Sequence, residues 1–212
     1  MSNLYEEIVQ HIFDRKRIPF PMIISVCGAA DLGKSYLCSS LVETLQHQGY
    51  HVAHLPLDSY LMSREQRINH GISGYDTEAY DFATIIKNLT AFKVGKEFSF
   101  TPYNHEGGTK QEQHEIIGKN DILLLDGLHA MDPRLMGSID FTIFIHTDDA
   151  RLRNIRREAD LIKRKQQPEL SEKFEPVEFQ KYKRFVEPYK QRANLVLYLQ
   201  LKWQYEVRVT DA

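Results

Sequence analysis

The chain has 212 residues, enough for one α/β domain with a sizeable core and short for two. Its hydrophobic content of 42% and its charged content of 26% are ordinary for a globular protein. The formal charge of −2 argues against a nucleic-acid partner, because nucleic-acid-binding proteins normally carry a basic excess.

Membrane association and compartment can also be predicted. No apolar run approaches the roughly 18–20 residues of a membrane span, and Glu6 and Glu7 fall early in the chain, where a signal peptide would become apolar. We therefore expect no membrane partner. The two cysteines, Cys27 and Cys38, fall in one predicted strand–helix unit, and reduced thiols in a cytoplasmic protein are the simplest interpretation.

The first predicted element is an amphipathic helix within residues 1–18. Its apolar residues recur at spacings of three and four: Leu4, Tyr5, Ile8, Val9, Ile12 and Phe13. Pro19 and Pro21 follow it. Because its polar face mixes acidic and basic residues, packing on a sheet is favoured over a membrane surface.

A phosphate-binding motif follows. Residues 22–27 predict a buried strand and 36–48 a helix with Tyr36 at its start, and the eight residues between them fit G-x-x-x-x-G-K-[ST]: Gly28, Ala29, Ala30, Asp31, Leu32, Gly33, Lys34 and Ser35. In this motif backbone N–H groups converge on the β-phosphate, Lys34 reaches the β/γ oxygens, and the Ser35 hydroxyl can ligate Mg²⁺. A helix N-terminus favours an anion. We predict that the chain binds a nucleoside triphosphate.

Asp58 follows a second predicted strand, 51–57. At the carboxyl edge of a sheet its carboxylate could accept the proton of an attacking hydroxyl. Asp is also a preferred helix N-cap, and the position alone leaves both roles open.

The middle of the chain predicts a helix over 77–92, capped by Thr77, and a small hairpin between 98–100 and 115–117. His105 and His114 flank the polar turn of that hairpin. They lack metal-ligand spacing, so they either bind a polar substrate or lie on an exposed loop.

Two short apolar runs, 122–125 and 141–145, predict parallel strands that are buried on both faces. Asp126 ends the first run. Such a carboxylate can lie beside a nucleotide-bound Mg²⁺, opposite Ser35. A turn or a helix cap is the alternative role.

A charged helical region is predicted over 149–190. Its first part carries four arginines: Arg151, Arg153, Arg156 and Arg157. They form either a solvated face balanced by acidic neighbours or a mobile lid, over about 151–175, that brings guanidinium groups to a γ-phosphoryl group. A nucleic-acid patch is the third and weakest interpretation. Closing strands are predicted at 194–201 and 205–209.

Strands and helices alternate along the chain, which predicts one domain over 1–212: a three-layer, doubly wound parallel α/β sheet with right-handed crossovers. Ligands bind such sheets at the carboxyl ends of the strands.

In order and spacing, several segments resemble the uridine kinase and phosphoribulokinase family, uridine kinases above all. Residues 58–60 resemble the family's Asp-Ser-Phe-Tyr segment, and 74–81 resemble its aromatic–Asp pair with the Pro-x-Ala-Phe-Asp that follows. The other matching segments are 101–104, 126–128, 147–152 and 186–194, and the similarity runs from about 22 to 200.

The resemblance implies a P-loop NTPase fold with a helical lid and a small β-hairpin for the acceptor. It implies ATP and Mg²⁺ as cofactors and transfer of the γ-phosphoryl group to a hydroxyl of a uridine- or cytidine-like nucleoside. Asp58 would be the base, aided by Lys34, Arg156 and Arg157, with Ser35 and Asp126 at the metal. The acceptor would meet Asp58 together with Tyr60, Tyr75, Asp76, Tyr103, His105 and Arg153.

Three departures from the family pattern leave the acceptor open. Asp31 replaces a small loop residue, Asp126 replaces a Glu, and Asn104-His105-Glu106 follows Tyr103. Pantothenate, glycerate or a sugar are alternative acceptors. A nucleotide-hydrolysing regulator and a catalytically weak nucleotide-binding protein are alternative functions. Family members often assemble, so a homo-oligomer is also an open expectation.

Overall fold

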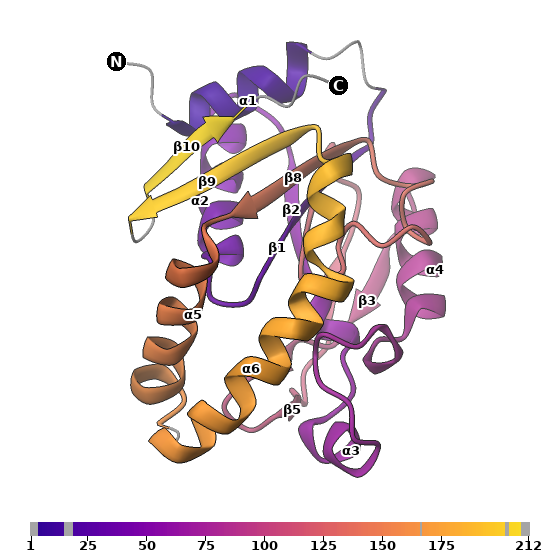
Figure 1. Ribbon diagram of the computed structural model, residues 1–212. Coiled ribbons are helices and arrows are strands. Elements are labelled where there is room, and N and C mark those ends of the chain that lie inside the picture. The colour runs from indigo at the N-terminus through magenta and orange to yellow at the C-terminus, as the bar shows by residue number, and fades with distance from the viewer. Residues whose placement is uncertain (1–3, 15–18, 166, 202–203, 209–212) are drawn as a thin grey trace.

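A six-stranded sheet with the order β10-β9-β8-β1-β7-β2 forms the centre of the protein (Figure 1). The computed structural model describes residues 4–14, 19–165, 167–201 and 204–208. The strands are β1 (Met22–Gly28), β2 (Val52–Pro56), β7 (Ile122–Asp126), β8 (Phe141–His146), β9 (Leu195–Leu201) and β10 (Gln204–Arg208). All neighbours pair in parallel except β10, which is antiparallel to β9. The predicted doubly wound parallel sheet is confirmed, with β10 as an antiparallel edge. The last predicted strand ended at Val209, which lies outside the described residues.

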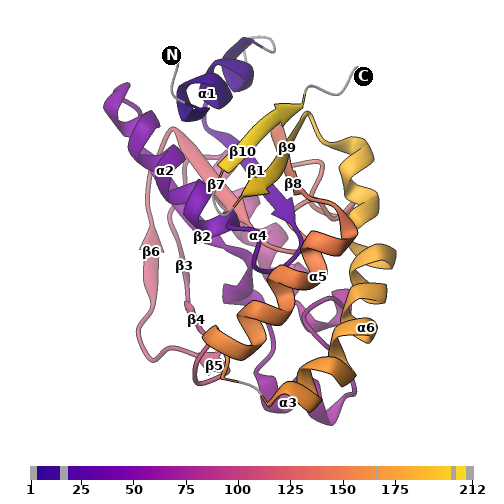
Figure 2. The same cartoon turned by 60° about the vertical axis from the view of Figure 1, so that its left-hand side comes forward.

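Helices cover both faces of the sheet. Figures 1 and 2 show α2 (Lys34–His47) on one face and α4 (Phe82–Lys93) on the other, with α1 (Leu4–Asp14) beside α2. This arrangement gives the three predicted layers. The N-terminal helix was predicted within 1–18, and α1 occupies the described part of that range.

The apolar runs form the core. Every residue of β1 and β7 is buried, as are the first five residues of β8. Strands buried on both faces need no alternation of polar and apolar residues, which explains their continuous apolar sequences.

The helix predicted over 77–92 begins later than expected. Residues 77–79 form the 3-10 turn η2 (Thr77–Ala79), and α4 starts at Phe82. The side chain of Asp81 caps α4 by accepting a hydrogen bond of 3.0 Å from the Thr84 N–H. The prediction of Thr77 as the cap was wrong. Tyr80 forms a β-bridge to Leu61, which interrupts the helix at that position. Asp81, the next residue and an equally favourable capping residue, therefore caps α4 instead.

The predicted hairpin is present and is accompanied by further structure. β3 (Phe98–Phe100) pairs antiparallel with β6 (Glu115–Ile117), and between them β4 (Tyr103–Asn104) pairs with β5 (Thr109–Lys110). A short helix that was not predicted, α3 (Arg64–Asn69), starts at a capping box formed by Ser63 and Gln66.

The charged region 149–190 is helical, as predicted, and contains two α-helices. α5 (Asp149–Glu158) continues as the π-helical turn η3 (Ala159–Lys163), and α6 (Pro168–Phe185) returns to the 3-10 helix η4 (Glu187–Arg192). We call residues 149–185 the helical arm. Figure 1 shows the arm extending beyond the carboxyl ends of the strands, where the predicted site lies.

Candidate active site

The phosphate-binding motif forms the loop that joins β1 to α2. Gly33 is the N-cap of α2, so Lys34 and Ser35 stand in its first turn. The Lys34 ammonium donates a hydrogen bond of 2.8 Å to the carbonyl oxygen of Ala29 across the loop. The exposed ring of Tyr36 lies on the next position of the helix. The loop therefore has the geometry in which backbone N–H groups and a lysine surround a phosphate.

Asp126 connects this loop to the end of β7. One of its carboxylate oxygens accepts a hydrogen bond of 2.8 Å from the Ser35 hydroxyl, and the other is 2.7 Å from Nε2 of His54 on β2. Gly127 allows the chain after β7 to approach Leu57 closely, because a Cβ at this position would lie 2.5 Å from Cβ of Leu57. Any larger residue would push the end of β7 away from Leu57, the residue before Asp58.

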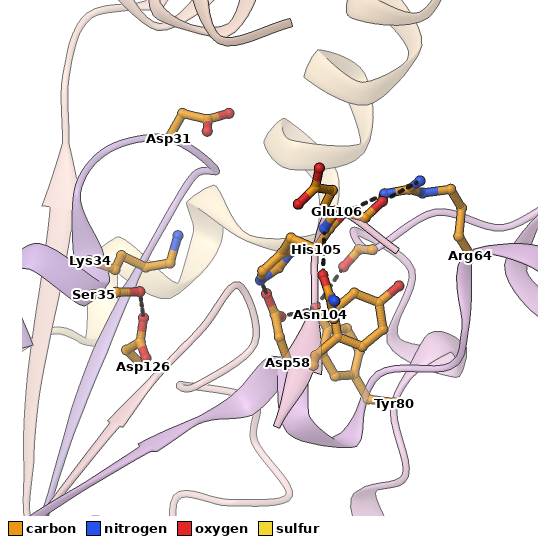
Figure 3. Close-up of polar contacts among 12 residues, drawn as sticks. Asp31, Lys34, Ser35, Asp58, Arg64, Tyr80, Asn104, His105, Glu106 and Asp126 are labelled. Atoms are coloured by element: carbon orange, nitrogen blue, oxygen red, sulfur yellow. Dashed lines mark hydrogen bonds and ion pairs between the residues drawn. The ribbon is translucent and has the colours of Figure 1, made fainter. Parts of the chain in front are cut away.

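Asp58 lies in the 3-10 turn η1 (Leu57–Tyr60) that follows β2. Its carboxylate accepts a hydrogen bond of 3.3 Å from the Tyr80 hydroxyl and lies 3.4 Å from Nε2 of His105 (Figure 3). Burial raises the pKa of the Asp58 carboxyl above its ordinary value, and the neighbouring His105 opposes this shift. A carboxylate with a raised pKa is a better proton acceptor than an ordinary one.

Lys34, Asp58 and Asp126 lie at one edge of the sheet. Asp126 is in register with Pro56, the last residue of β2, and with Val26 of β1, so β7 and β2 end at the same level and β1 continues from there to Gly28. The charges of Asp126 and Lys34 also act on the pKa of Asp58. Figure 3 shows the three side chains around one region. The structure thus brings together the three residues that the sequence proposed for the phosphate, the proton and the metal.

The residues expected to contact the acceptor form a second group beside Asp58. The Tyr75 hydroxyl accepts a hydrogen bond of 3.3 Å from the Ala30 N–H of the phosphate loop. The Tyr103 hydroxyl accepts one of 3.0 Å from Arg67, and the Tyr103 ring meets His105 edge-on. Tyr60 does not join this group: its side chain is buried, and its hydroxyl accepts a hydrogen bond from Asn88 of α4.

Asp76 connects the residues expected to contact the acceptor with the helical arm. Its carboxylate accepts hydrogen bonds from the Lys181 ammonium of α6 and, at 2.7 Å, from the Ser73 N–H. Burial alone would raise the pKa of Asp76, but the bonds from Lys181 and Ser73 outweigh it and lower that pKa. Asp76 is therefore held as a carboxylate that faces the arm.

The arm arginines bind carboxylates in different places. Arg156 contacts Asp31, Asp160 and Glu178. Arg153 pairs with Glu175 at 2.8 Å, whereas Arg157 is exposed.

Asp31, the unusual residue of the phosphate loop, is the point where the arm meets that loop. Its backbone is left-handed, with φ 63°, and its carboxylate lies 2.8 Å from Arg164 and 3.6 Å from Arg156. The side chain therefore contacts the arm. This placement accounts for a negative charge in a loop built to hold an anion.

Three residues near the site were missed by the sequence analysis. His54 interrupts an otherwise apolar strand, and a lone polar residue in such a run was a usable signal. Arg164 and Lys181 gave no signal, because charged residues are ordinary on any exposed helix.

The donor set at the end of β7 fits a nucleotide-bound Mg²⁺. Mg²⁺ prefers oxygen ligands and takes only one or two from the protein when phosphates supply the others. The Ser35 hydroxyl and the Asp126 carboxylate, already in contact, provide these oxygens.

Comparison with known proteins gives this arrangement its context. The sequence profile described as "Phosphoribulokinase / Uridine kinase family" matches residues 23–201. The chain belongs to this family. The uridine kinase of Alkaliphilus metalliredigens (strain QYMF) is 28% identical over 186 residues, which cover 84% of this chain and 86% of that protein. The uridine kinase of Escherichia coli (strain K12) is 26% identical over 187 residues, covering 83% and 86%.

Solved structures of the same fold include several kinases. A D-glycerate 3-kinase from Cryptococcus neoformans superposes with a TM-score of 0.70 at 11% identity and covers 98% of this chain and 100% of its own. A possible uridine kinase from Bacillus stearothermophilus gives 0.63 at 16% identity, covering 90% and 98%. These likenesses confirm the P-loop kinase fold. Within the described part of the chain, no helix combines the length and apolar character that crossing a membrane requires.

Proposed function

We propose that this kinase transfers the γ-phosphoryl group of ATP, bound with Mg²⁺, to a hydroxyl of a uridine- or cytidine-like nucleoside in the cytoplasm. Family membership supports a kinase and therefore a phosphotransferase. The observation that carries the rest is the convergence of Lys34, the Ser35–Asp126 pair and Asp58 at the carboxyl edge of β1, β2 and β7.

The loop residues would bind and orient the triphosphate. Lys34 would leave the carbonyl oxygen of Ala29 and contact the β/γ oxygens, while the loop N–H groups and the N-terminus of α2 hold the β-phosphate. Ser35 and Asp126 would hold Mg²⁺, which neutralises phosphate charge when it is bound. Arg156, which lies against Asp31 of the phosphate loop, would supply further positive charge, whereas the exposed Arg157 would contribute little.

Asp58 would act as the general base. Its carboxylate would accept the proton of the acceptor hydroxyl as that oxygen bonds to the γ-phosphorus and the bond to the β-phosphate oxygen breaks, releasing ADP. The Tyr80 hydroxyl fixes the orientation of the carboxylate. His105, which now occupies the exposed side of Asp58, would move aside or bind the acceptor through its ring nitrogen.

The acceptor would lie between Asp58 and the arm. Tyr75, Asp76 and Tyr103 border this region, and Arg153 lines a neighbouring cavity between the phosphate loop and the arm, together with Tyr75 and Ala30. A polyhydroxylated molecule would replace Lys181 as the hydrogen-bonding partner of Asp76. A nucleoside sugar satisfies this requirement, and the family relatives favour it.

An acceptor panel tests the proposal. We would measure ADP release with Mg²⁺-ATP in the presence of uridine, cytidine, pantothenate, glycerate or simple sugars, with no acceptor as the control. Turnover that depends on uridine or cytidine supports the proposal. Turnover only with another acceptor would replace the nucleoside, and turnover without any acceptor would indicate a nucleotide hydrolase instead.

A further inference from the structure

The carboxylate at the end of β7 has neighbours that a magnesium site does not need. The Cys38 thiol, a ring nitrogen of His54 and a carboxylate oxygen of Asp126 all lie within 4.8 Å of one another. Cys38 and Asp126 are buried and His54 is partly buried. Sulfur, imidazole nitrogen and carboxylate oxygen form a donor set typical of transition metals.

Three different elements bring these donors together. Cys38 stands on α2 one turn after Ser35, facing the sheet. His54 lies near the middle of β2, and Asp126 ends β7, the strand paired with β2. Secondary structure therefore fixes all three positions, unlike a cluster of loop residues.

The distances are close to those of a metal centre. Zinc binds sulfur at about 2.3 Å and nitrogen or oxygen at about 2.0–2.2 Å, so ligands of a tetrahedral site lie about 3–4 Å apart. The present separations, up to 4.8 Å, need a contraction on the order of 1 Å, which side-chain rotation can supply. The Ser35 hydroxyl, 2.8 Å from Asp126, is placed to approach the remaining position.

We propose that Cys38, His54 and Asp126 form a binding site for a thiophilic divalent ion such as Zn²⁺ or Co²⁺. On binding, Cys38 releases its thiol proton to solvent. His54 ligates through Nε2 as a neutral imidazole with its single ring proton on Nδ1, so a proton carried by Nε2 toward Asp126 passes through solvent to Nδ1 before the metal binds. Mg²⁺ does not compete for the sulfur and nitrogen donors, because it prefers an octahedron of oxygens.

Such an ion would affect the kinase. Asp126 cannot serve both this site and the Mg²⁺ of the nucleotide, so the ion would inhibit phosphoryl transfer in competition with Mg²⁺. This consequence depends on the proposed function, whereas the binding itself does not.

Cobalt absorption tests the binding in the absence of nucleotide. Titration of the chelator-treated full chain with Co²⁺ should give one equivalent of binding, with a thiolate-to-cobalt charge-transfer band and the intense visible bands of tetrahedral Co²⁺, all removed by Zn²⁺. Replacing Cys38→Ala or His54→Leu should weaken Co²⁺ binding more than about tenfold. Cys27→Ala changes the other buried cysteine, which lies outside the site, and should retain the affinity of the unmodified chain.

The thiolate-to-cobalt band is measured on the unmodified chain, so this part of the test does not depend on whether a variant folds. Absence of that band, or unchanged affinity in folded Cys38→Ala or His54→Leu protein, overturns the site. No Co²⁺ binding by a chain that phosphorylates an acceptor would overturn this inference alone. Co²⁺ binding through Cys38 by a chain that phosphorylates no acceptor would support the site and remove the proposed function.

Discussion

The carboxyl edge of the sheet and the helical arm use charge in different ways. At the edge, Lys34 and Asp126 follow or end the fully buried strands β1 and β7, and Asp58 follows β2, which pairs with β7. In the arm, charged side chains bind mainly one another: Arg153 pairs with Glu175, and Arg156 with Asp160 and Glu178. A charge fixed by a core is available for chemistry, whereas a charge fixed by another charge must first be released.

The largest effect expected from this difference is at the edge. Lys34→Ala removes the cation from the β/γ oxygens and should lower kcat/KM by about 10²–10³ while also weakening ATP binding. Steady-state kinetics together with calorimetric ATP titration would measure both. Unchanged turnover would remove the loop from the mechanism.

Asp58→Asn should separate chemistry from binding. It removes the base, so phosphoryl transfer should fall by about 10² or more with ATP affinity nearly intact. An equal loss of ATP affinity would instead indicate that Asp58 is mainly a metal ligand.

The pH dependence of kcat/KM gives a second test of Asp58 as the general base. Because burial raises the pKa of Asp58, the carboxylate is protonated, and activity lost, at a pH above the ordinary Asp value of about 3.9. His105 holds that pKa down, so His105→Asn should move the acid limb of kcat/KM to higher pH. His114→Asn, at the other histidine of the hairpin, is the control and should leave the limb in place.

Two neighbouring arginines test the arm. Arg156→Gln should lower kcat by about tenfold or more, because its guanidinium lies against Asp31 of the phosphate loop and can be transferred to a phosphoryl group. Arg157→Gln, at an exposed position, should change kcat less than twofold. Equal effects of the two changes on kcat would contradict the distinction, and thermal unfolding would separate lost stability from lost chemistry.

The smallest expected effect is the coupling between the loop and the arm. A double-mutant cycle with Asp31→Asn and Arg164→Gln, measured by urea unfolding, should give a coupling energy of about 0.5–1 kcal/mol between the two side chains. The same cycle on Glu206 and Arg208, an exposed pair 3.3 Å apart, should give close to zero. No difference between the cycles would mean that Asp31 does not hold the arm.

The sequence predicted the edge better than the arm for a physical reason. Buried parallel strands leave continuous apolar runs, and a residue that ends such a run, as Asp126 does, must lie at the carboxyl edge, next to the turn with Asp58 that follows the paired strand β2. Arm contacts such as Lys181 with Asp76 join residues far apart in sequence on exposed helices, where no periodicity distinguishes one lysine from another. The departures from the family pattern were visible in the sequence, but only the structure shows that Asp31 contacts the arm and His105 contacts Asp58.

Helix α3 and the β4–β5 turn, next to Tyr103 and His105, are joined so closely that they form one structural unit. The Arg64 N–H donates a hydrogen bond of 2.6 Å to the Gly108 carbonyl oxygen, and the Arg64 guanidinium binds the carbonyl oxygen of His105. Gly108 has φ 72°, and a Cβ there would lie 2.8 Å from Arg64. Replacing one of these segments with the matching segment of a relative would break its contacts with the other. A chimera designed to change acceptor preference would therefore need both 61–80 and 101–112 from the same relative.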